Sequence, residues 1–181
     1  IYAFFQVGSI ITTCGYATTD FDLWPETSKM ILVLLMFIGA CAGSTGGGFK
    51  ISRLLILCKA IPKQLSLVIH PREVKVIRMD GKPIDHNTLR STNVYLAIYF
   101  FILLVSTLLI SVDNFNLTTN FTAVASTLNN IGPGLDGVGP TRNFGMYSDF
   151  SKFVLMFDML AGRLELYPLL ILFMPSLWRR K

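Results

Sequence analysis

The uncharged stretch "STNVYLAIYFFILLVSTLLISV", residues 91–112, is the strongest indication of the fold class of this chain. It holds about 22 residues, and a helix needs about 20 apolar residues to cross the hydrocarbon core of a bilayer. The chain is 52% hydrophobic and 15% charged, whereas a soluble domain carries about 25% charged residues. We therefore expect an all-α membrane protein. The alternative, a soluble protein with an apolar core, would have to account for this uninterrupted run.

The charged residues predict which loops face the cytoplasm. Residues 50–90 contain nine basic and three acidic side chains, and Arg179, Arg180 and Lys181 end the sequence. Acidic residues dominate on the other flanks: Asp20, Asp22, Glu26, Asp113, Asp136 and Asp149. Because cytoplasmic loops carry an excess of Lys and Arg, we expect a multi-pass protein with a cytoplasmic linker and C-terminus. A basic inner face accounts for the net charge of +5 without a nucleic-acid partner.

The other apolar segments are too short to cross a bilayer alone. The sequence begins at Ile1 inside an apolar run, so we expect it to be the C-terminal part of a longer protein. Predicted elements are a short helix over 3–12, a helix over 28–42, a break at "GSTGGG" (43–48), a basic helix from 49 to 61, a hairpin at Asp80-Gly81, a short helix over 121–130 capped by Thr119 or Asn120, and a long helix over 149–178.

Two parts of the sequence repeat one plan. "FFQVGSIITTCGYA" aligns with "FTAVASTLNNIGPG", and "SKMILVLLMFIG" aligns with "SKFVLMFDMLAG". The matched pairs are Phe4 with Phe121, Ser9 with Ser126, Thr13 with Asn130, Gly15 with Gly132, Ser28 with Ser151, Lys29 with Lys152, and Gly39 with Gly162. We therefore expect two units, each a short helix, a glycine-bearing loop and a longer helix.

The glycine-bearing loops predict a cation pathway. Irregular backbone at membrane depth is tolerated where it lines a water-filled cavity. Each short helix ends at its loop, and a helix C-terminus carries a partial negative charge. Glycine lets backbone carbonyl oxygens point toward an ion without steric cost. Both loops would therefore favour a cation at the same place.

Four motifs give the chain a family resemblance: "TTCGY" (12–16), "NNIGPG" (129–134), "GSTGGGFK" (43–50) and "GRLELYP" (162–168). With them the chain resembles the Trk/Ktr/HKT superfamily of potassium-translocating proteins, and most closely its TrkH-like pore subunits. The resemblance implies repeated helix–pore loop–helix units, with broken transmembrane helices, around one pseudo-fourfold pore. Residues 1–62 would be the pore helix, filter loop and broken second helix of repeat three, 63–90 a cytoplasmic linker, and 91–181 the complete repeat four.

The resemblance also implies the site residues. The filter would be built from Thr13, Cys14 and Gly15 with Asn130, Ile131 and Gly132, and potassium would bind at Thr13, Cys14, Asn130 and Ile131. The gate would be the loop Gly43, Ser44, Thr45, Gly46, Gly47 and Gly48 together with Arg163, a positive barrier below the filter. Pro133 and Ala17 stand where potassium channels have tyrosine and a second glycine, which implies a less strict filter.

The implied protein catalyses no covalent chemistry. Potassium would be the transported ion, with no covalently bound cofactor. The implied location is a bacterial inner membrane, with lipid around the pore. The implied partners are a second copy of the pore subunit and a cytosolic ring of nucleotide-binding (RCK-type) subunits on the basic face.

Alternatives remain for several of these residues. The glycine loop could be a plain helix kink or a nucleotide-binding loop, although Phe49 separates Gly48 from Lys50 and a helix precedes the loop. Arg163 could be a structural partner of Asp158 or Glu165, since charges within membranes generally pair. A sodium-permeable transporter of the same build also remains open, because two further pore loops are not in this sequence. The cysteines and histidines lack the spacing of a metal site.

Overall fold

The computed structural model describes residues 1–41, 43–44, 46–70, 77–79 and 82–164. Within them the chain forms helices α1 (Tyr2–Ile11), α2 (Glu26–Ile38), α3 (Ile51–Ile69), α4 (His86–Ile110), α5 (Leu117–Leu128) and α6 (Asp149–Leu164). Short 3₁₀ turns are η1 (Phe21–Leu23), η2 (Ser111–Asp113), η3 (Asp136–Val138) and η4 (Phe144–Met146). Strands β1 (Arg78–Met79) and β2 (Lys82–Pro83) pair antiparallel on either side of the predicted Asp80-Gly81 turn, whose two residues lie outside the described part.

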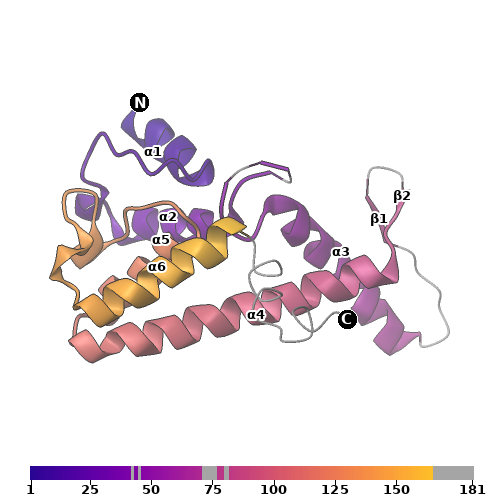
Figure 1. Ribbon diagram of the computed structural model, residues 1–181. Coiled ribbons are helices and arrows are strands. Elements are labelled where there is room, and N and C mark those ends of the chain that lie inside the picture. Colours follow the sequence, from indigo (N-terminus) through magenta and orange to yellow (C-terminus); the bar gives the residue numbers. More distant parts are fainter. Residues whose placement is uncertain (42, 45, 71–76, 80–81, 165–181) are drawn as a thin grey trace.

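Helix α4 is the long apolar element on which α3, α5 and α6 pack, whereas α1 packs on α2 (Figure 1). Asn87–Asp113 is the one segment of the described residues that is long and apolar enough to cross a membrane. Tyr95, Tyr99 and Leu103 recur every four residues and are buried, whereas Phe101 and Leu104 are exposed. This spacing places one face of α4 against the protein. Helix α3 packs on its N-terminal half, and α5 and α6 pack on its C-terminal half (Figure 1).

Three helices differ from the sequence-based expectation, and one of them is α3, which was expected over 49–61 but runs from Ile51 to Ile69. The helix predicted over 28–42 ends at Ile38, because the chain turns at Gly39 with φ of +67°, a left-handed value that glycine adopts readily. Helix α5 starts at Leu117, and its N-cap residue is Asn116. The predicted caps Thr119 and Asn120 are therefore wrong.

Both of these side chains lie inside helix α5 and use their polar groups in tertiary contacts instead. The Thr119 hydroxyl donates to Asp136 Oδ2 (2.9 Å), and Asn120 Oδ1 accepts from the Tyr147 hydroxyl (3.0 Å). The last predicted helix is described to Leu164, and its predicted continuation to residue 178 lies outside the described residues.

The predicted repeat is visible in hydrogen bonds before the second helix of each unit. Asp20 Oδ1 accepts from the amide of Asp22 (3.0 Å) at η1, and Asn143 Oδ1 accepts from the amide of Gly145 (2.8 Å) at η4. The first turns that follow carry matching ion pairs, Lys29–Glu26 (2.9 Å) and Lys152–Asp149 (3.6 Å). Each acidic residue stands at the positive end of its helix. The two units therefore share their local structure as well as their order.

Apolar side chains form two clusters that meet at one aromatic contact. One cluster joins α4, α5 and α6, and the other joins α1 and α2 to the loop after α5. Phe37 and Phe121 pack against both clusters, with ring centroids 6.0 Å apart. This contact holds α2 of the first unit against α5 of the second and brings the two glycine-bearing loops together.

Candidate functional site

Both short helices end in the same hydrogen-bonded turn. At the end of α1, the Thr13 amide donates to Ile10 O (3.1 Å) and the Cys14 amide to Ser9 O (2.9 Å). At the end of α5, the Asn130 amide donates to Thr127 O (3.0 Å) and the Ile131 amide to Ser126 O (2.9 Å). These two bonds define a Schellman motif, which ends a helix by turning the chain back over its last carbonyls.

The residue that makes each turn has a left-handed backbone. Thr13 has φ of +56° and Asn130 has φ of +55°. Asparagine is tolerated in this region, but a β-branched threonine is a rare outlier there. Such positions cost about 1–3 kcal/mol each and cluster at functional sites. The strain thus falls on the first predicted filter residue of each unit.

One serine in each short helix fastens the loop that follows. The Ser9 hydroxyl donates to Tyr16 O (2.6 Å), and the Ser126 hydroxyl donates to Gly132 O (3.1 Å). Ser9 and Ser126 are the pair that the sequence alignment matched. Each loop is therefore hydrogen-bonded to its own helix at both its first and its last residues.

The two loops touch at Gly15. A β-carbon built on Gly15 would overlap the carbonyl oxygen of Ile131 and lie 3.1 Å from Pro133 Cδ. Only a glycine permits this approach of backbone to backbone. The structure therefore brings the predicted filter residues Thr13–Gly15 and Asn130–Gly132 side by side. Each loop also borders an open hollow: about 780 Å³ beside Thr12 and Cys14, and about 460 Å³ beside Asn130, Ile131 and Gly132.

The glycine loop leaves helix α2 and returns to nearly the same point. The amide of Ile51, the first residue of α3, donates to Ala40 O (3.2 Å). Near the tip, a β-carbon on Gly46 would lie 3.1 Å from Thr13 Oγ1, and one on Gly47 would overlap the carbonyl oxygen of Asn129. The loop thus lies against the ends of both short helices. Thr45 falls outside the described residues, and the hydroxyl of the half-buried Ser44 donates to Cys41 O (2.7 Å).

Arg163 follows a glycine that contacts the second predicted filter loop. A β-carbon on Gly162 would overlap Leu128 O and lie 2.7 Å from Asn130 Nδ2. Asn130 Nδ2 itself donates to Met159 O (3.1 Å). The Arg163 side chain is exposed, whereas Asp158 is fully buried and accepts from the Ser106 hydroxyl (2.7 Å). Glu165, the other suggested partner of Arg163, lies outside the described residues.

Acidic residues join the loop after α1 to the loop after α5, a link that the sequence did not suggest. Asp22 Oδ1 accepts from the amide of Asp136 (3.0 Å), and burial raises the pKa of the Asp22 carboxyl. Asp136 Oδ2 accepts from Asn116 Nδ2 (3.1 Å) and from Thr119, and these bonds lower the pKa of Asp136. The sequence shows Asp136 within the glycine-rich stretch "GLDGVGP", but nothing in the sequence pairs this residue with Asp22.

The rival chemistries of the glycine loop find little support in the described residues. A nucleotide-binding loop follows a strand, whereas this loop follows helix α2. Within the described part of the chain, no group of three or more His, Cys, Asp or Glu side chains is placed to hold a metal ion. The polar groups near the two predicted filter loops are chiefly backbone carbonyls and the side chains of threonine, asparagine and serine.

Comparisons with known proteins cover nearly the whole chain. The family model TrkH, described as a cation transport protein, matches residues 1–180. The chain is 40% identical over 177 residues to the Trk system potassium uptake protein TrkH of Vibrio parahaemolyticus, and 38% identical to that of Escherichia coli K12. Each alignment covers 98% of this chain and 36% of the relative, so the chain spans about a third of their length.

A solved structure agrees with the sequence matches. The crystal structure of the potassium transporter TrkH from Vibrio parahaemolyticus superposes with a TM-score of 0.88 at 40% identity. The match covers 98% of this chain and 38% of that chain. Because both the backbone and the sequence agree over nearly all residues, the helical fold of this chain is that of a membrane transporter.

Proposed function

Because this chain belongs to the TrkH family of cation transport proteins, which are transporters and not enzymes, we propose that it forms part of a pore for potassium uptake. The observation that carries the proposal is the contact between two glycine-bearing loops of identical hydrogen bonding, Thr13–Gly15 and Asn130–Gly132. The C-terminal ends of α1 and α5, with their partial negative charge, both adjoin these loops. A desolvated cation is the ligand that such an arrangement favours.

The backbone carbonyls of the two loops form the proposed filter. Potassium contacts the carbonyl oxygens of Thr13, Cys14, Asn130 and Ile131, which replace part of its water shell. Gly15 and Gly132, both with positive φ, let the loops continue without side chains between them. Two further repeats, on the part of the family's length that this chain does not span, complete a pseudo-fourfold ring.

The glycine loop, Gly43–Gly48 with Ser44 and Thr45, forms the proposed gate. This assignment is supported by the contacts of the loop: Gly46 lies beside Thr13 and Gly47 packs against Asn129, next to both proposed filter loops. A loop in this place blocks ions when seated and admits them when displaced. Arg163 contributes a fixed positive charge just after Gly162, which itself contacts the second filter loop.

The proposed setting is a multi-pass protein in a bacterial inner membrane. Residues 1–62 belong to repeat three, 63–90 form the cytoplasmic linker and 91–181 form repeat four, although helix α3 continues past residue 62 to Ile69. The basic segment 50–90 faces the cytoplasm and receives an RCK-type ring of nucleotide-binding subunits. The pore subunit forms a homodimer. Relatives named as parts of a "Trk system" support the existence of partners.

The test of the filter is the ratio of potassium to sodium uptake into liposomes. Gly132 has φ of +112° and no atom within 4 Å of a built β-carbon, so Gly132→Ser meets no neighbour and acts only through the backbone. Leaving glycine's backbone region costs about 1–2 kcal/mol, and we expect the preference for potassium to fall roughly 5- to 30-fold. Gly8→Ser, in α1 with the same open space, is the control.

Each result of this test has a clear meaning. An unchanged ratio in Gly132→Ser would contradict the filter assignment. Equal uptake of the two ions by the parent protein would instead favour the sodium-permeable alternative. In that case the filter residues would keep their place in the pore, but the pore would not select potassium.

A further inference from the structure

Asn129, the residue directly before the second filter loop, holds a buried polar link. Its side chain is completely buried, and Tyr99 on α4 is 3% exposed. The Tyr99 hydroxyl donates to Asn129 Oδ1 (2.8 Å), and Asn129 Nδ2 donates to Ala125 O (2.7 Å). The Asn129 amide group therefore joins α4 to the end of α5. A buried amide that lost one of these partners would be left unsatisfied.

The glycine loop rests on the same asparagine. A β-carbon on Gly47 would overlap the Asn129 carbonyl oxygen, and one on Gly48 would lie 3.0 Å from Asn129 Oδ1. The oxygen that accepts from Tyr99 is thus also the atom against which Gly48 packs. On the other side of the link, Phe49 packs on the Tyr99 ring with centroids 6.2 Å apart. The last residues of the loop therefore contact both members of the pair.

The corresponding position in the first unit lacks this link. Thr12 matches Asn129 in the alignment and makes the same backbone bond, from its hydroxyl to Gly8 O (2.7 Å), but its side chain is exposed. The asparagine adds a second polar group, which meets Tyr99. The second polar group thus belongs to the residue directly before the filter loop of the second unit. The glycine loop packs against this same residue.

We propose that Asn129 and Tyr99 are positioning residues through which the glycine loop and the filter loop of residues 130–132 constrain each other. When Gly47 and Gly48 are seated, they fix the Asn129 carbonyl and amide. The Asn129 backbone in turn fixes the left-handed turn at Asn130. Displacing the loop removes this support, so opening the gate and loosening the filter occur together. Only the expected effect of this coupling on ion transport rests on the proposed function.

The decisive experiment is amide hydrogen exchange on the purified protein, because it does not depend on transport. Tyr99→Phe removes one hydroxyl and keeps the ring that packs on Phe49. We expect exchange to quicken at least fivefold in residues 46–49 and also in residues 130–132. The matched control is Tyr95→Phe, one turn earlier on α4. Tyr95 is equally buried (3%), and its ring packs on Phe49 with centroids 5.9 Å apart.

The outcomes separate coupling from damage. Faster exchange in both loops in Tyr99→Phe, but not in the filter loop of Tyr95→Phe, supports the link. Acceleration in one loop alone, in neither loop, or equally in both variants would overturn it. Ion flux adds a second measurement: Tyr99→Phe should raise potassium leak several-fold in the parent and have no further effect once "GSTGGG" is shortened. A parent without potassium flux would refute the proposed function, while the exchange data would still decide the coupling.

Discussion

Adding one methyl group at Gly47 should open the proposed gate. A β-carbon there would overlap Asn129 O and lie 2.8 Å from Asn129 C and 3.1 Å from Asn130 Cβ. Widening the 2.8 Å contact alone to the 3.4 Å at which ordinary van der Waals contact begins takes about 0.6 Å, and the overlap with the oxygen requires a larger shift. Because Gly47 packs against main chain, no side-chain rotation can relieve the overlap. Gly47→Ala therefore disfavours the seated loop specifically.

The size of the effect follows from the cost of overpacking. Extra methyl groups in well-packed sites cost about 1–3 kcal/mol, and about 1.4 kcal/mol corresponds to a factor of ten in an equilibrium. If the cost applies only to the seated loop, the balance between seated and displaced loops shifts about 5- to 150-fold. In the parent protein the seated loop is taken to be the major state. We therefore expect potassium flux in the absence of a regulator to rise about 5- to 150-fold.

The assay is potassium flux into liposomes, normalised to correctly folded protein. Gly8→Ala is the control, because a β-carbon on Gly8 has no neighbour within 4 Å and alanine favours a helix. The control should retain the parent's flux. Unchanged or lower flux in Gly47→Ala, with a folded fraction equal to that of the parent, would refute the gate assignment.

Three further predictions concern the gate, the barrier and the outer loops. Shortening "GSTGGG" by three residues should raise conduction and weaken the response to a regulator, and folded protein that conducts no better than the parent would count against the gate. Arg163→Ala should raise potassium flux per folded molecule and leave the selectivity of the filter unchanged. A positive charge about 6 Å from the ion repels it by roughly 3 kcal/mol at an effective dielectric near 20. Lower flux together with lower thermal stability would show instead that Arg163 is a structural residue. Hydrogen bonds from Asn116 and Thr119 hold the pKa of the Asp136 carboxyl below its usual 3.8. The ionised carboxylate therefore stabilises the fold at pH values above 3.8, and this stabilisation is lost as the pH falls through the lowered pKa. Asp136→Asn should therefore lower the melting temperature at pH 7, and the difference from the parent should shrink between pH 5 and pH 3; a difference independent of pH would exclude this role of the charge.

Features that depend on short stretches of chain could be predicted from the amino-acid sequence. The long span was predicted from residues 91–112 because a bilayer sets a length that composition reveals. The repeat was predicted from matched residues, and its hydrogen bonds join residues at most seven apart, as in Ser9 to Tyr16 and Cys14 to Ser9. Such bonds depend on local backbone geometry, so matching residues produce matching turns.

Some predictions from local rules were nevertheless wrong. Thr119 and Asn120 have the chemistry of helix caps, but both lie inside α5 and bind Asp136 and Tyr147. Of the two alternative partners considered for Arg163, Asp158 is buried and accepts from the Ser106 hydroxyl on α4, and Glu165 lies outside the described residues. In each case a side chain at a packed helix face took a partner from another element, because burial makes an unsatisfied polar group costly.

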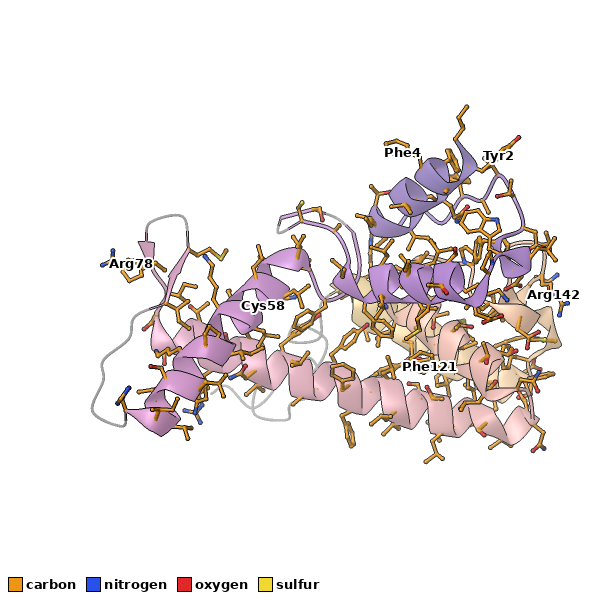
Figure 2. The ribbon with its side chains drawn as sticks, turned by 180° about the vertical axis from the view of Figure 1, so that it is seen from behind. Tyr2, Phe4, Cys58, Arg78, Phe121 and Arg142 are labelled. Carbon is orange, nitrogen blue, oxygen red and sulfur yellow. The ribbon has the colours of Figure 1, made fainter. Side chains whose placement is uncertain are left out.

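Contacts between groups far apart in the sequence could be found only from the folded structure. The bond of Tyr99 to Asn129 spans 30 residues, and that of Asp136 to Asp22 spans 114. The contact of Gly15 with Ile131 and the seat of Gly47 on Asn129 likewise depend on how the two units pack. Glycine in a sequence signals a close approach or an unusual turn, but it does not identify the neighbour. The neighbour is set by the relative placement of α2, α4 and α5, which packing across many residues determines together (Figure 2).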